Sequence, residues 1–146
     1  MQHARTAREL LQLVSRWEPF LLSLPSDVGD RKAGSRWTAK ELVGHLVDSA
    51  INHHQLWVRL HDGDLVFPRY AQDEWVARAG YADFPWQDLV RLWAGHNRLL
   101  ASVAMQIPIA SLHHRWIDGE RDLKDLLEHY LDHTRHHLAV IEGALD

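Results

Sequence analysis

Apolar residues recur at three- and four-residue steps in four long segments of the chain, which is the period of an amphipathic α-helix. The segments cover residues 4–24, 38–60, 83–107 and 122–144. The first carries an apolar stripe made of Leu10, Leu11, Val14, Trp17, Leu21 and Leu22. No stretch shows the strict alternation typical of a strand. The pattern predicts an all-α protein, and four helices of about twenty residues with mostly modest connections favour an up-down four-helix bundle.

Local signals place the ends of these helices. Thr38-Ala-Lys-Glu41 matches a capping box, which predicts that the second helix begins there. Asp83 lies two residues before Pro85, so Asp83 is the expected N-cap of the third helix, with the proline in its first turn. Residues 67–78 are expected to form a short helical turn over one end of the bundle, and residues 107–121 a loop.

Length and composition indicate one soluble globular domain over residues 1–146. The chain is 46% hydrophobic and 25% charged, which is enough apolar material for a buried core. A net charge of −4 provides no basic surface of the kind that nucleic acids or anionic membranes require, so neither partner is expected. The apolar runs are shorter than a membrane span, and the first residues lack the apolar stretch of a signal peptide. We therefore expect a cytoplasmic protein.

Several chemistries find no support in the sequence. Cysteine is absent, which excludes disulfides, thiolate metal ligands and a thiol nucleophile of the protein itself. Thiol chemistry would therefore use an exogenous thiol. The chain also lacks a serine nucleophile elbow, a phosphate-binding glycine loop and a dinucleotide fingerprint.

A histidine pair in the last predicted helix indicates a metal site. His133 and His137 are four residues apart, which corresponds to about 6 Å of rise and roughly 40° of rotation, so both project from one face. His45 lies on the apolar stripe of the second helix and is the best candidate for a third ligand. Three neutral imidazoles with one open coordination position are typical of a catalytic metal site rather than a closed structural one.

The other histidines are weaker candidates among the twelve in the chain. His136 lies three residues from His133 and competes with His137, although the four-residue spacing gives the better rotation. His129 precedes His133 by four residues and is either a fourth ligand or, as we prefer, a neighbour. The remaining histidines considered are two doublets expected to face solvent and one residue without an assigned role: His53-His54, His113-His114 and His96.

Charged residues near these positions suggest two further roles. Asp48 lies one turn after His45 and is a candidate for orienting a ligand imidazole or accepting a proton from bound water, with a surface salt bridge as the alternative. Four cations at helix ends and in loops are candidate anchors for a substrate carboxylate, although such residues usually face solvent. These are Arg31, Lys32, Arg36 and Arg59.

Two runs carry a resemblance to a known family. The first contains Trp37, Lys40, Glu41, Gly44, His45, Leu46, Asp48 and Ser49, and the second is the His-x-x-His-His run from His133 followed by Ile141. Together they resemble the DinB/YfiT-like superfamily over essentially the whole chain. The resemblance implies a four-helix bundle, usually dimeric, with zinc or nickel held by His45, His133 and His137. Characterised relatives include transferases that use a low-molecular-weight thiol and isomerases that depend on one, and others were described as metal-dependent hydrolases.

The three-histidine site admits more than one function. A dication with an open position lowers the pKa of a bound thiol or of bound water. Our preferred interpretation is a homodimeric enzyme that transfers a low-molecular-weight thiol to an electrophilic small molecule. The alternatives are a metal-dependent hydrolase of a small amide or ester, with Asp48 or a nearby histidine moving the proton, and a dimeric metal- or ligand-binding protein without turnover. The sequence leaves the native metal, the thiol and the electrophile open.

Overall fold

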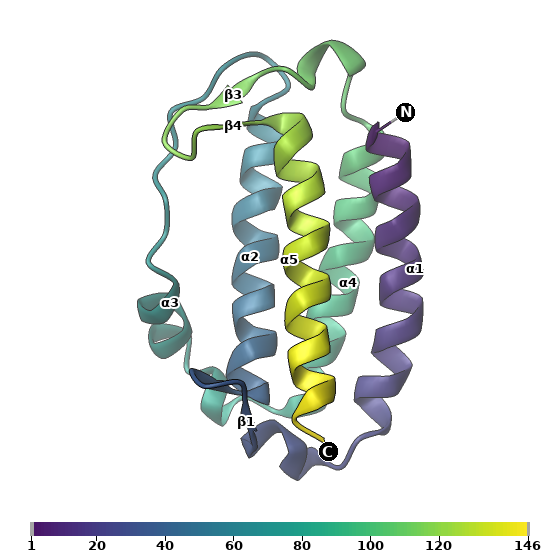
Figure 1. Cartoon of the computed structure of the whole chain (residues 1–146), viewed down its shortest axis with the longest axis vertical. Coiled ribbons are helices and arrows are strands. Elements are labelled where there is room, and N and C mark those ends of the chain that lie inside the picture. The colour runs from purple at the N-terminus through teal and green to yellow at the C-terminus, as the bar shows by residue number, and fades with distance from the viewer. Residues whose placement is uncertain (1, 146) are drawn as a thin grey trace.

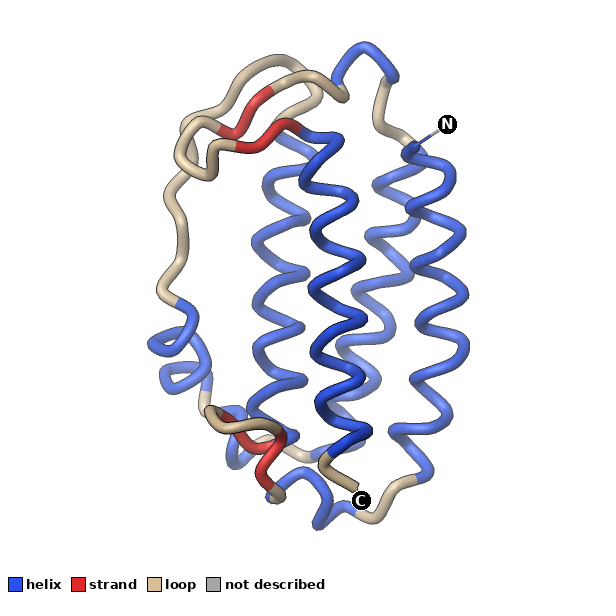
Figure 2. Tube along the Cα trace, in the orientation of Figure 1, coloured by secondary structure: helices blue, strands red, loops and turns tan. Residues whose placement is uncertain are grey.

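Four long helices form an elongated bundle in the computed structural model, which describes residues 2–145 (Figures 1 and 2). They are α1 (Gln2–Ser23), α2 (Ala39–Arg59), α4 (Trp86–Met105) and α5 (Leu123–Gly143). The short helix α3 (Gln72–Ala79) lies outside the bundle beside α2, close to the helical turn predicted for residues 67–78. The all-α bundle predicted from the sequence is confirmed. Within residues 2–145, every helix is too short or too polar to cross a membrane.

Two short antiparallel hairpins lead into the helices that carry the candidate ligands. Strands β1 (Lys32–Ala33) and β2 (Trp37–Thr38) precede α2, and β3 (Arg115–Trp116) and β4 (Arg121–Asp122) precede α5. The hairpins lie at opposite ends of the bundle, because α2 and α5 begin at opposite ends (Figure 1). The sequence pattern predicts no strands, because a two-residue strand is too short to show an alternating pattern.

The order of helix directions corrects the simple up-down arrangement. Helices α2 and α4 run in the same direction, whereas α1 and α5 run in the opposite one (Figure 1). The reason is the connection formed by residues 60–85, which leaves the end of α2, crosses back along the bundle with α3, and reaches the other end before α4 begins. A short connection would have forced antiparallel neighbours.

The core consists of two apolar clusters, and all four long helices contribute to each. Leu21, Val43, Leu89 and Ile141 are among the residues buried at one end. At the other end the buried residues include Leu10, Leu56, Leu100 and Leu127. Full burial of a leucine side chain stabilises by about 1.5–3 kcal/mol relative to exposure, so this core supplies the main driving force for folding.

The helix starts agree with the sequence signals in one case and differ in another. Thr38 caps α2 as predicted: its Oγ1 accepts from the Glu41 amide at 3.2 Å, and its own amide donates to Glu41 Oε1 at 3.2 Å. The prediction that Asp83 is the N-cap of α4 is wrong. Its amide bonds the Gly80 carbonyl at 3.1 Å, within the 3₁₀ turn Tyr81–Asp83, and α4 starts after Pro85. The φ of −59° at Pro85 suits a helix entry without a side-chain cap.

Candidate metal centre

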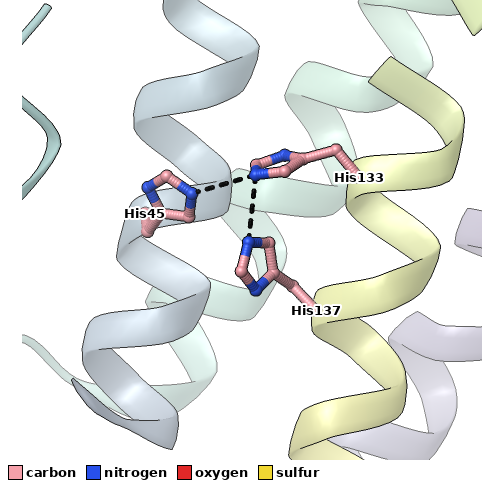
Figure 3. A group of neighbouring side chains, drawn as sticks. All are labelled: His45, His133 and His137. Carbon is pink, nitrogen blue, oxygen red and sulfur yellow. Dashed lines mark hydrogen bonds between the residues drawn. The ribbon is translucent and has the colours of Figure 1, made fainter. Parts of the chain in front are cut away.

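Three imidazoles converge between α2 and α5 (Figure 3). His45 projects from α2 and meets His133 and His137, which project from α5 one turn apart. His133 Nε2 lies 3.4 Å from His45 Nε2 and 3.0 Å from His137 Nε2. One ring nitrogen from each of the three residues lies within 4.8 Å of the other two. The structure therefore brings together the three residues predicted as ligands.

Proton sharing alone does not satisfy this arrangement. The Nε2 atom of His133 faces two other Nε2 atoms, yet a neutral imidazole nitrogen either donates one proton or accepts with one lone pair. A single cation at the centre uses the lone pairs of all three nitrogens at once. Tetrahedral ligands at 2.0–2.1 Å from zinc lie about 3.3 Å apart, which is close to the separations observed here. The residues fit a divalent metal, and binding of the metal itself stays a prediction.

The electrostatic environment keeps the three rings neutral. Burial lowers the pKa of His45 to about 4, with further contributions from the charges of His137 and Arg36. Burial, followed by the charges of His137 and His45, lowers the pKa of His133 to about 3. For His137, burial and then the charges of His136 and Arg36 lower the pKa to about 4. At neutral pH the lone pairs are therefore available to a metal without competition from protons.

An aromatic ring and an ion pair cover one side of the centre. The Trp37 ring lies 4.7 Å from the His45 ring, and the Arg36 guanidinium lies 4.3 Å from the centroid of the Trp37 ring. Arg36 Nε donates to Asp73 Oδ1 at 2.8 Å, which ties the β1–β2 turn to α3. Within residues 2–145, His45 Nδ1 has no hydrogen-bond partner.

A cavity of about 230 Å³ adjoins His133. It lies between α2, α5, the β3–β4 hairpin and the middle of the 60–85 connection, where α3 begins. The lining residues are Ser49, His53, Arg69, Tyr70, Gln72, Trp116, Gly119, Arg121, Leu126, His129 and His133. The cavity gives a small molecule access to the edge of the histidine cluster.

Asp48 contacts a tyrosine rather than a ligand imidazole. Tyr81 Oη donates to Asp48 Oδ1 at 2.6 Å, and within residues 2–145 the carboxylate forms no hydrogen bond to His45, His133 or His137. Burial raises the pKa of Asp48 to about 6. A Cβ atom at position 44 would lie 2.1 Å from the Tyr81 ring, so Gly44 is required for this contact. The predicted role of Asp48 as an orienting carboxylate has no supporting contact.

Two neighbouring histidines on α5 stay outside the cluster. His136 is exposed, and its neighbour His137, four residues after His133, joins the cluster, as the predicted rotation implies. The His129 ring is stacked on His133 with centroids 5.8 Å apart and an interplanar angle of 24°. It lines the cavity as a neighbour of the cluster.

The expectation that the His53-His54 doublet faces solvent is wrong for His53. Its Nδ1 lies 2.8 Å from the Ser49 carbonyl, its ring lies 4.9 Å from the Tyr130 ring, and burial lowers its pKa to about 4. A signal was present in the sequence, because His45, Ser49 and His53 follow one another at four-residue steps on α2. They face His129, His133 and His137, which follow one another at the same spacing on α5.

The remaining histidines lie away from the cavity. His54 Nδ1 lies 3.0 Å from His96 Nε2 between α2 and α4, so His54 also departs from the solvent-facing expectation. His113 is exposed as expected, whereas His114 is half-buried against the Leu60 carbonyl. None of these residues lines the cavity.

The cations of the cavity were missed by sequence reasoning. Arg69 and Arg121 line it, whereas the predicted anchors Arg31, Lys32, Arg36 and Arg59 do not. Arg69 lies in the long connection and Arg121 in β4, and neither segment carries a periodic pattern from which its neighbours could be deduced.

Fold and site together define a helical, enzyme-like protein with a three-histidine candidate centre for a divalent metal. Residues 2–141 match the family model described as the DinB superfamily, and the chain belongs to that superfamily. No curated protein and no solved structure matches the chain.

Proposed function

We propose that this protein is a divalent-metal-dependent transferase that moves a low-molecular-weight thiol onto an electrophilic small molecule. The observation that carries the proposal is the convergence of three neutral imidazole nitrogens, one of them from His133, which also lines a cavity of small-molecule size. When bound, a zinc or nickel ion supplies the positive charge that lowers the pKa of a thiol at its open position. The protein supplies the ligands, the orientation and the partial exclusion of water.

The cavity favours a thiol over water as the activated molecule. A thiol with a pKa near 8.5 needs only a modest decrease to ionise at neutral pH, whereas water starts at about 15.7 and benefits from a separate general base. No Asp or Glu is among the residues that line the cavity within the described chain. Asp48, whose Oδ1 accepts from Tyr81, and Asp73, which is bonded to Arg36, are both outside this lining.

The apolar side chains of the cavity suit an organic substrate. Trp116 and Leu126 provide an apolar surface beside the polar groups of Ser49 and Tyr70. Trp116 Nε1 donates to the Phe67 carbonyl at 2.7 Å, which fixes the indole ring. A fixed wall of this kind orients an electrophile relative to the metal ligands and reduces the entropy lost in the reaction.

Hydrolysis of a small amide or ester is the second candidate, and His129 favours it. Burial, followed by the charge of Arg121, lowers the pKa of His129, so its imidazole is neutral at pH 7 and able to accept a proton. His129 lines the cavity beside His133 and is placed to act as a general base for water.

The test compares metal-loaded and chelator-treated protein, each with and without a small thiol, in the turnover of a chromogenic aryl halide. Turnover should require both the metal and the thiol. His137→Ala should remove it, whereas His136→Ala, which changes an exposed histidine on the same helix, should retain it. Cleavage of esters without thiol, with thiols acting only as inhibitors, would establish the hydrolase instead. Absence of both activities while the metal stays bound would favour a binding protein without turnover.

A further inference from the structure

The cavity beside His133 is positively charged, in a protein whose net charge is −4. Arg69 and Arg121 line it. Within residues 2–145 neither forms a salt bridge, and six of the thirteen arginines do. Arg121 is half-buried, and a guanidinium group in such a place is costly without an anionic partner. Arg121 therefore holds a half-buried positive charge at the cavity, and no carboxylate of the described residues is paired with it.

Hydrogen bonds between two distant segments hold the rim of the cavity in place. The Leu65 amide donates to the Arg115 carbonyl at 2.8 Å, and the Ile117 amide donates to the Leu65 carbonyl at 2.9 Å. These bonds join the 60–85 connection to the β3–β4 hairpin, which carries Arg121. The rim is thus preorganised rather than assembled by the ligand.

Arg69 is fixed by the same rim. Its Nε donates to the Asp118 carbonyl at 2.8 Å, which leaves both terminal nitrogens of the guanidinium for a ligand. The Asp118 carboxylate accepts from the Phe67 amide at 2.8 Å and is occupied there. A Cβ atom at position 119 would lie 2.0 Å from the Trp116 ring, so Gly119 lets the hairpin close tightly around the cavity.

We propose that this cavity binds a small molecule with a carboxylate group, anchored by Arg121 and Arg69, whose other end reaches the metal held by His45, His133 and His137. The planar, multiple donors of a guanidinium match the two oxygens of a carboxylate. Hydroxyl and amide groups of Ser49, Tyr70 and Gln72 complete the polar lining. The assignment of the metal-directed end to a thiol rests on the proposed function, whereas the carboxylate end rests on the arginines alone.

Three thiols of similar size test the proposal on protein loaded with cobalt(II), in which thiol ligation is visible in the absorption spectrum. They are 3-mercaptopropionate, neutral 2-mercaptoethanol and cationic cysteamine. The carboxylate thiol should bind about tenfold or more tightly than the neutral one, as expected for hydrogen bonds to a charged group, and cysteamine should bind most weakly. Equal affinities for the first two would overturn the proposal.

Arginine variants make the test specific. Arg121→Gln should remove the preference for 3-mercaptopropionate without changing the affinity for 2-mercaptoethanol, and Arg121→Lys should keep part of it. Arg115→Gln is the matched control, because Arg115 is exposed on the same hairpin and does not line the cavity. Circular dichroism establishes that each variant is folded. A preference that persists in folded Arg121→Gln would contradict the proposal.

Calorimetric titration of glutarate, a dicarboxylate without a thiol, separates this proposal from the proposed function. Binding of glutarate that Arg121→Gln abolishes, together with no cobalt–thiol signal, would support the carboxylate site and refute the thiol transferase. A clear 2-mercaptoethanol signal without glutarate binding would refute the carboxylate site and leave the transferase standing.

Discussion

The two pairs of facing helices, α1 with α4 and α2 with α5, differ in the side chains that lie between them. The centre of the contact between α1 and α4 is apolar and fully buried, with Leu10 and Leu21 on one helix and Leu89 and Leu100 on the other, and the Arg98–Glu18 ion pair joins the two helices closer to solvent. The indole nitrogen of Trp86 donates to the Leu21 carbonyl at 2.9 Å and satisfies a polar group in this contact. This side of the bundle is closed and contributes mainly stability.

Between α2 and α5 the facing positions are histidines, and a cavity adjoins them. His45, His53 and His133 are kept neutral largely by burial, which opposes their protonation. Buried polar groups in such a cluster contribute little to folding and mark a candidate binding site. One wall of the bundle is thus mainly a stabilising contact, and the other carries the candidate metal centre. Substitutions on the two walls should therefore have separable effects on stability and on metal binding.

The largest loss of stability is expected in the apolar core. Trp93 on α4 is completely buried, and Trp93→Ala should lower the free energy of unfolding by about 3–5 kcal/mol. Urea denaturation of metal-free protein measures this. The adjacent Leu92, which is 49% exposed, is the control, and Leu92→Ala should change stability by about 0.5 kcal/mol or less. Similar losses for the two variants would show that α4 is not packed as described.

On the open side, His133→Ala should affect metal binding much more than folding. Loss of an outer partner of a metal ligand costs about 10–100-fold in affinity, so loss of the ligand itself should cost more than about 100-fold. Competition with a chromogenic chelator measures the affinity, and circular dichroism should show unchanged helix content. If removal of the metal unfolded the wild-type protein, the site would be structural and the separation of the two walls would fail.

Acid should destabilise the metal-free protein through the open side. The pKa values of His45, His53, His133 and His137 are about 3–4 in the folded state, against about 6.5 when unfolded, so only the unfolded chain takes up these protons as the pH falls from 6.5 toward 4. Stability is therefore full above pH 6.5 and decreases through that window. Asp48, whose pKa is raised, acts in the opposite direction but is one group against four.

Urea midpoints at pH 7.5 and pH 5 measure this effect, and Trp93→Ala should lower both midpoints without changing their difference. A midpoint that is independent of pH would indicate that the histidines are not buried in the neutral form.

The smallest changes in stability are expected for two glycine substitutions, one in α2 and one in α4. Gly44→Ala places a methyl group 2.1 Å from the Tyr81 ring and should cost about 1–3 kcal/mol, because Tyr81 must move away from Asp48. Gly95→Ala meets no atom within 4 Å and should stabilise by about 0.5–1 kcal/mol through helix propensity. Thermal unfolding of both variants checks the opposite signs, and a stabilising Gly44→Ala would contradict the described contact.

Features that depend on local spacing were predictable from the sequence. The helical period located the four helices, the Thr38–Glu41 capping box marked the start of α2, and the four-residue spacing of His133 and His137 placed them on one face. His45 was found because an imidazole on an apolar stripe needs a partner. Each of these inferences uses residues that lie within a few turns of one another.

Features that depend on the path of the chain were not predictable. The parallel direction of α2 and α4 follows from the 60–85 connection, whose residues show no periodic pattern. Arg69 and Arg121 become neighbours only because that connection bonds to the β3–β4 hairpin through Leu65 and Ile117. The contact between Asp48 and Tyr81 was not predictable either, because Tyr81 lies 33 residues away and belongs to the same connection.

The meeting of His45 and His133 also constrains how the site forms in time, since 88 residues separate them along the chain. A contact between distant residues requires a large loop to close, and the chain loses conformational entropy before the contact contributes any stabilising energy. Such contacts therefore form late in folding unless an apolar nucleus has already brought their helices together. A metal ion added during refolding should therefore be captured only after the tryptophan fluorescence has reached its native value. The time at which the metal binds would then report when folding is complete.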